Sequence, residues 1–119
     1  MSTTIKYSLE FLKNLNYIAE KVEQWIPHTS IRKDLFGFAD IIAIKEGVKG
    51  NLAVQSTTKS EIQSHCDKAM EECGVALRIW IEGGNTFIIH GWIDKGKTMK
   101  SVEAKLSKDS IIYFEECKL

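Results

Sequence analysis

Two short apolar segments joined by a polar turn, all within residues 33–58, constrain the fold of this chain most strongly. Residues 41–44 read Ile-Ile-Ala-Ile, residues 45–50 are polar and glycine-containing, and residues 51–54 form the second, largely apolar segment. Short apolar runs bounded by turn residues predict buried β-strands. Because the connection is tight, the strands are expected to be antiparallel neighbours, about 5 Å apart.

Polar side chains stand at the outer ends of these two predicted strands. Asp40 opens the first strand, and Gln55-Ser56-Thr57 closes the second. In an antiparallel pair these two ends meet at the same edge of the sheet. A carboxylate and an amide oxygen at that edge suit a hard cation such as Mg²⁺. The alternative is a capping Asp40 and a Gln55 that bonds a neighbouring loop.

The run Asp34-Leu35-Phe36-Gly37-Phe38-Ala39-Asp40, followed by this strand pair, resembles the PD-(D/E)xK nuclease superfamily, closest to phage and archaeal Holliday-junction-resolvase-like members. The family pattern is an acid opening one strand and acid-x-Lys closing the next. Asp40 matches the first acid, whereas Gln55 stands for the second acid and Thr57 for the lysine. Some restriction-enzyme branches of the superfamily use Gln-x-Lys. The resemblance covers about the first two thirds of the chain.

The resemblance implies an α/β fold with a restriction-endonuclease-like α-β-β-β-α-β core, a mixed central sheet flanked by helices. It also implies a metal-dependent DNA endonuclease that hydrolyses a phosphodiester, on branched DNA such as Holliday junctions, with Mg²⁺ or Mn²⁺ as cofactor. Asp40, the Gln55 side chain and the Ser56 carbonyl would hold the ion. The alternative function is a catalytically weakened nuclease fold that binds nucleic acid or a protein partner.

The lysine of the family pattern needs a substitute in this sequence. Thr57 can form hydrogen bonds but cannot supply a cation. Lys59 lies two residues further along and would have to reach back to position the attacking water. A solvated Lys59 at the start of a helix is an equally weighted alternative.

A further acid would complete the metal site. Resolvase-like members carry a glutamate on the first helix, which Glu10 matches here. Asp34 is the alternative second acid, because a loop can fold it toward the edge where Asp40 lies. Glu20 and Glu23, on the expected first strand, are weaker candidates. Resolvase-like relatives act as dimers, so a homodimer acting on DNA is expected.

The composition predicts a single globular domain over residues 1–119. Sixteen basic residues balance 16 acidic ones, so the chain lacks the basic excess typical of nonspecific nucleic-acid binders. No apolar run approaches the ~20 residues that span a bilayer, and residues 1–6 lack a signal-peptide pattern. Three cysteines without CxxC spacing favour a reducing compartment. We expect a cytoplasmic protein of a bacterial or phage-infected cell, without membrane contact.

The first third of the chain predicts a helix and a strand. Residues 5–15 carry apolar side chains at helical spacing. We expect a strand over residues 17–25, although periodicity alone would extend the helix to Ile26. The strand follows from the resemblance, in which a helix is followed by a strand. Residues 28–36 are expected to form a loop.

The second half predicts one helix and further strands. The helix begins near Lys59 with Ser60 as its N-cap, and Gly74 interrupts it. A strand rich in β-formers covers residues 86–93, and one or two edge strands lie within residues 101–114.

Overall fold

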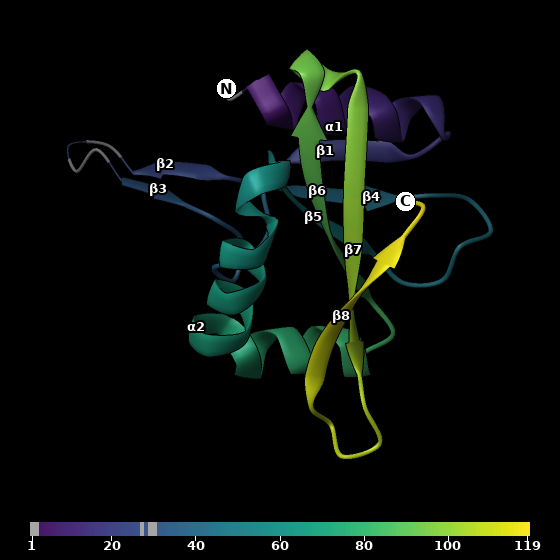
Figure 1. Ribbon diagram of the computed structural model, residues 1–119. Helices are drawn as coiled ribbons and strands as arrows, with labels where there is room; N and C mark the ends of the chain where they lie inside the picture. Colours follow the sequence, from purple (N-terminus) through teal and green to yellow (C-terminus); the bar gives the residue numbers. More distant parts are fainter. Residues whose placement is uncertain (1–2, 27, 29–30) are drawn as a thin grey trace.

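Over the residues that the structure describes, the chain forms a mixed α/β fold with a six-stranded mixed sheet and two α-helices (Figure 1). The computed structural model describes residues 3–26, 28 and 31–119. The α/β class and the mixed sheet flanked by helices are confirmed. The elements in chain order are α1 (Thr3–Asn14), β1 (Ile18–Lys21), β2 (Gln24–Ile26), β3 (Ile31–Lys33), β4 (Ile41–Ile44), β5 (Leu52–Thr58), the 3₁₀ turn η1 (Lys59–Glu61), α2 (Ile62–Glu82), β6 (Thr86–Ile93), the turn η2 (Asp94–Gly96), β7 (Thr98–Leu106) and β8 (Ile112–Cys117).

The strands of the large sheet follow the order β1-β4-β5-β6-β7-β8. Among the described strand pairs of this sheet, only β5 and β6 are parallel, and α2 provides the crossover connection that a parallel pair requires. The predicted antiparallel pairing of β4 with β5 is confirmed, with Ile41 opposite Val54. β2 and β3 form a separate two-stranded ribbon that projects from the sheet in Figure 1.

The two helices cover opposite faces of the sheet, because neighbouring residues on a strand point to opposite sides. On β5, Val54 packs in the cluster that contains Ile5 and Leu12 of α1. Its neighbour Ala53 packs in the cluster that contains Leu77 of α2. Since β5 is central and covered on both faces, it is buried almost throughout, and the burial extends beyond the apolar run 52–54 to the polar residues Gln55, Ser56 and Thr57.

The expected strand over residues 17–25 is divided between two sheets. β1 ends at Lys21, and the chain then leaves the large sheet to form β2. The expected loop over residues 28–36 contains β3, paired with β2, while residues 29 and 30 lie outside the described residues. A three-residue strand is too short to show a two-residue period, which explains why the sequence predicted a loop there.

Helical structure begins at Lys59 as expected, with η1 leading directly into α2, but the expected N-cap and the expected interruption are wrong. Ser60 lies inside η1, and Glu61 occupies the N-cap position of α2. The helix continues through Gly74 and changes direction along its length (Figure 1). Glycine lowers helix stability by about 1 kcal/mol without forbidding the conformation. Burial of Ala69 before it and Leu77 after it holds both parts against the sheet.

Candidate metal centre

Asp40 lies immediately before β4 and is fixed by both neighbouring segments. Its N–H donates to the carbonyl of Val54 at 2.9 Å, and its carbonyl accepts from the N–H of Val22 at 2.8 Å. Only 2 % of its surface is exposed. Its Oδ2 atom accepts hydrogen bonds from Gln55 Nε2 at 2.8 Å and from the Ser56 N–H at 2.9 Å. The structure therefore brings Asp40 and Gln55 together at one edge of the sheet, as the strand pairing predicted.

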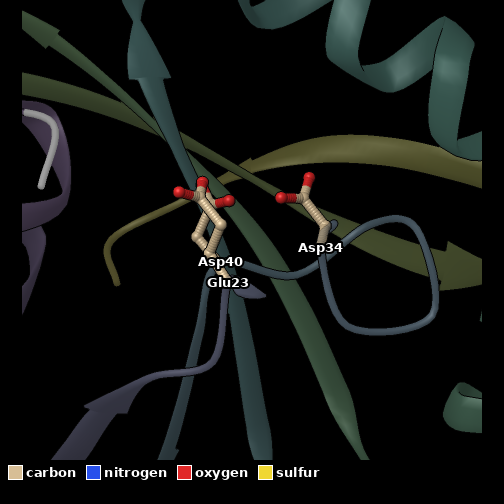
Figure 2. Close-up of side chains that lie close together, drawn as sticks. All are labelled: Glu23, Asp34 and Asp40. Atoms are coloured by element: carbon tan, nitrogen blue, oxygen red, sulfur yellow. The ribbon is translucent and has the colours of Figure 1, made fainter. Parts of the chain in front are cut away.

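Two further acids lie beside Asp40. Carboxylate oxygens of Glu23, Asp34 and Asp40 all lie within 4.8 Å of one another. Glu23 follows the end of β1, and Asp34 comes from the loop before β4. Figure 2 shows the three carboxyl groups extending in the same direction from separate segments. We call Glu23, Asp34 and Asp40 the acid cluster.

The two neighbouring acids disfavour the charged form of Asp40. Burial is the main cause that raises the pKa of Asp40 from 3.8 to about 8; the neighbouring Asp34 and Glu23 contribute in the same direction, and the hydrogen bond from the Ser56 N–H opposes the shift. A divalent cation would offset this repulsion. Carboxylate oxygens are the ligands that Mg²⁺ and Mn²⁺ prefer, so the residues present fit such an ion.

The other residues expected to bind the metal ion, Gln55, Ser56 and Glu10, lie in different surroundings. Gln55 turns its amide nitrogen to Asp40, so that atom orients the acid rather than contacting a cation. The Ser56 carbonyl accepts a hydrogen bond from Thr4 Oγ1 at 3.4 Å. Glu10 is not part of the acid cluster and instead lines a hollow between α1 and the β6–β7 turn.

Sequence reasoning ranked Asp34 as an additional acid and Glu23 lower still. The pairing register explains why Glu23 belongs to the cluster. Lys21 stands opposite Ile41, so the chain just beyond β1 runs alongside Asp40. A single strand over residues 17–25 would have no break after Lys21, so it does not predict this position of Glu23.

Thr57 and Lys59, the two residues expected to replace the family lysine, lie in different surroundings. Thr57 is buried, and its Oγ1 donates to Glu61 Oε2 at 3.0 Å. Lys59 is exposed and lines a different hollow, together with Lys100 and Glu116 of the β7–β8 pair.

Two basic side chains of α2 lie closer to the expected site. His65 and Lys68 line the same recess as Gln55. Burial lowers the pKa of His65, while the charges of Glu61 and Asp34 oppose that shift. Sequence reasoning missed both residues, although their spacing of three places them on one side of a helix.

A buried polar network supports β5 from its other face. Ser8 of α1 accepts a hydrogen bond from Trp92 Nε1 at 2.9 Å and lies 2.7 Å from the Ser56 hydroxyl. His90 places Nδ1 2.9 Å from Ser8 Oγ and Nε2 2.6 Å from the backbone oxygen of Leu119. Because this oxygen can only accept, Nε2 carries the proton of the neutral ring. The network holds Ser56, whose N–H orients Asp40, against α1.

The carboxylates that cluster at the start of β4 make this α/β protein a candidate for binding a divalent cation. No family model, curated protein or solved structure matches this chain. Within the described part of the chain, no helix is long and apolar enough to cross a membrane.

Proposed function

We propose that this chain is a metal-dependent DNA endonuclease of the PD-(D/E)xK type, with a restriction-endonuclease-like core. The observation that carries the proposal is the acid cluster of Glu23, Asp34 and Asp40, with oxygens within 4.8 Å of one another. The element order supports it, because a helix precedes the strands, β4 and β5 form the antiparallel hairpin, and α2 leads to β6.

The acid cluster would hold Mg²⁺ or Mn²⁺ through its carboxylates. When bound, the ion would polarise the phosphodiester and lower the pKa of a water molecule. Gln55 and the Ser56 N–H keep Oδ2 of Asp40 in place. Burial lowers the pKa of His65, which favours the neutral ring that can accept a proton beside Gln55, and Lys68 in the same recess offers a positive charge for the phosphate.

The proposed partner is DNA, bound by a homodimer. The chain has zero net charge, so a single copy has little long-range attraction for a polyanion. Two copies side by side would bring their lysines together into one basic face. Sedimentation of the protein with and without DNA checks this part of the proposal.

A second candidate function is a nuclease fold that binds nucleic acid or protein without cleavage. It is favoured by Thr57, a neutral residue at the position of the family lysine. The hydroxyl of Thr57 donates a hydrogen bond to Glu61. Such a protein would bind the ion and the partner but leave the phosphodiester intact.

Cleavage of labelled four-way-junction, flap and linear DNA, with Mg²⁺ or Mn²⁺, separates the two functions. The variants are Asp40→Asn and, as control, Glu46→Gln, an exposed acid in the β4–β5 turn. The endonuclease proposal predicts metal-dependent cleavage that Asp40→Asn abolishes and Glu46→Gln retains. Salt-sensitive DNA binding without cleavage by any of the three proteins would favour the second function.

A further inference from the structure

A hollow of about 700 Å³ lies between α1 and the β6–β7 turn. This volume is typical of small-molecule sites, which occupy about 300–1,000 Å³. Three aromatic side chains, Tyr7, Phe11 and Trp92, form one part of its wall. Their rings meet edge to face, with centroids 5.6 Å apart for Tyr7 and Trp92 and 6.0 Å apart for Phe11 and Trp92.

The rim of the hollow is positively charged. Lys95, Lys97 and Lys118 line it and are exposed, and none of them forms an ion pair with another described residue. Glu10 is the only acid among its described lining residues. By contrast, Lys100 on β7 is paired with Glu116 at 2.8 Å. The hollow therefore concentrates uncompensated positive charge on a chain with zero net charge.

The turn that presents two of these lysines has an unusual backbone. Asp94, Lys95 and Gly96 have φ values of 51°, 54° and 86°, so three consecutive residues are left-handed. This conformation is unfavourable for residues other than glycine, and such outliers cluster at functional sites.

The turn is also fixed to α1. A Cβ atom on Gly96 would lie 2.7–2.8 Å from ring carbons of Tyr7, so only glycine permits this contact. Figure 1 shows the tip of the β6–β7 pair beside α1. Lys95 and Lys97 are thereby held at the rim of the hollow.

We propose that this hollow binds one nucleotide unit of a single-stranded DNA segment. The base would pack against the aromatic wall, and the flanking phosphates would contact Lys95, Lys97 and Lys118. A base within a duplex is stacked on both sides, so its ring faces are not available to the aromatic wall, of which Tyr7 and Phe11 are half-buried and Trp92 is 7 % exposed.

The choice of DNA as ligand rests on the proposed function, which this site deepens by naming an unpaired strand as part of the substrate. The parallel pairing of β5 with β6 aligns Thr58 with Trp92. The hollow and Asp40 therefore lie toward the same end of the sheet, the hollow on the face covered by α1 and Asp40 on the face covered by α2. A free mononucleotide carries the same base and phosphate groups as one unit of a DNA strand, so the test compares a mononucleotide with an oligonucleotide.

Fluorescence anisotropy with a labelled oligothymidylate, in chelator so that no metal-dependent cleavage occurs, measures this binding. The test variant is Lys95→Ala/Lys97→Ala, and the control is Lys49→Ala/Lys108→Ala, two exposed lysines in other turns. We expect the test variant to bind roughly tenfold more weakly and the control to stay within about twofold. The slope of log affinity against log salt should fall by roughly 0.7 for each lost phosphate contact.

Two competitors define the ligand. A duplex of the same length should compete poorly, and thymidine monophosphate should compete only at much higher concentration than the oligonucleotide. Equal competition by duplex or by mononucleotide would overturn the assignment to a single strand. Equal weakening in both lysine variants, or in neither, would overturn the site.

The outcomes also separate this site from the nuclease proposal. If cleavage depends on Asp40 but single-strand binding is unchanged by Lys95→Ala/Lys97→Ala, the proposed binding site in the hollow is wrong and the nuclease proposal stands. If single-strand binding needs Lys95 and Lys97 but the protein does not cleave DNA, the nuclease proposal is wrong and the binding site in the hollow stands.

Discussion

The amide nitrogen of Gln55 donates a hydrogen bond to Oδ2 of Asp40 over 2.8 Å, at the position where the proposed nuclease family would carry a second acid. An amide there stabilises the buried Asp40 carboxyl group, whereas a second carboxylate would repel it. The same exchange removes one unit of negative charge that would attract a cation. Gln55 therefore favours the metal-free protein at the expense of metal affinity.

Gln55→Glu should reverse that balance. We expect the free energy of unfolding without metal to fall by roughly 1–3 kcal/mol, because the new carboxylate meets Asp40 in a buried site. The stabilisation by Mg²⁺ or Mn²⁺ should increase, since the ion gains a charged ligand. Urea unfolding with and without metal measures both effects. Gln63→Glu, an exposed position on α2, is the control and should leave the metal response unchanged.

The stability of the metal-free protein should depend on the ionisation of Asp40. Its pKa is about 8 in the folded state against 3.8 ordinarily, so between these values the folded state holds a proton that the unfolded state releases. Raising the pH across this window therefore favours unfolding, by up to about 1.4 kcal/mol per pH unit. Urea unfolding in chelator at several pH values measures the slope. Asp40→Asn should remove it, and an unchanged slope in that variant would show that another group is responsible.

His90 should produce a pH dependence of opposite sign. Burial lowers its pKa from 6.5 to about 4, so between these values the unfolded state binds the extra proton. Stability is then lost as the pH falls through this window, by up to about 1.4 kcal/mol per unit. The slope is best measured in the Asp40→Asn background, where the Asp40 contribution is absent. Direct NMR titration of His90 in that variant provides a second readout, and a titration near the ordinary value would contradict the prediction.

Gly37, in the loop that carries Asp34 and Asp40, should tolerate a side chain poorly. Its φ is 83°, and an added Cβ would lie 2.9 Å from Cys73 Sγ. Gly47 has the same φ of 83° with no atom near an added Cβ. Gly47→Ala should therefore destabilise by about 1 kcal/mol through backbone strain alone, and Gly37→Ala by roughly 1 kcal/mol more.

Thermal unfolding of the two glycine variants, each with and without Cys73→Ala, isolates the contact. The additional loss in Gly37→Ala should shrink when the sulfur atom is removed, while the effect of Gly47→Ala stays the same. Equal losses for both glycine variants would show that the loop adjusts around the added methyl group.

The central part of the fold is predictable from sequence because local patterns and tertiary packing agree there. The residues of β4 and β6 lie at the predicted positions, and α1 differs by only one or two residues at each end. The patterns fail where pairing with a distant segment decides the structure. β3 exists only through its pairing with β2, and α2 passes Gly74 because both of its halves pack on the sheet.

The candidate site shows the same division. Asp40 and Gln55 were predictable as neighbours because a tight antiparallel hairpin fixes where its ends meet. Glu23 depends on the register of β1 against β4, and His65 on the position of α2 over β5, which no local pattern encodes. Sequence reasoning placed Lys59 by its proximity in the chain, but that lysine turns toward β7 and β8.

A titration with Mn²⁺, followed by electron paramagnetic resonance, tests the central claim that the acid cluster holds a divalent cation. We predict saturable binding by the wild-type protein, at least tenfold weaker binding after Asp40→Asn, Asp34→Asn or Glu23→Gln, and unchanged binding after Glu46→Gln. Each substitution removes a charged oxygen ligand while preserving the size of the side chain. Absence of saturable binding, or binding that the three cluster variants leave unchanged, would contradict the account.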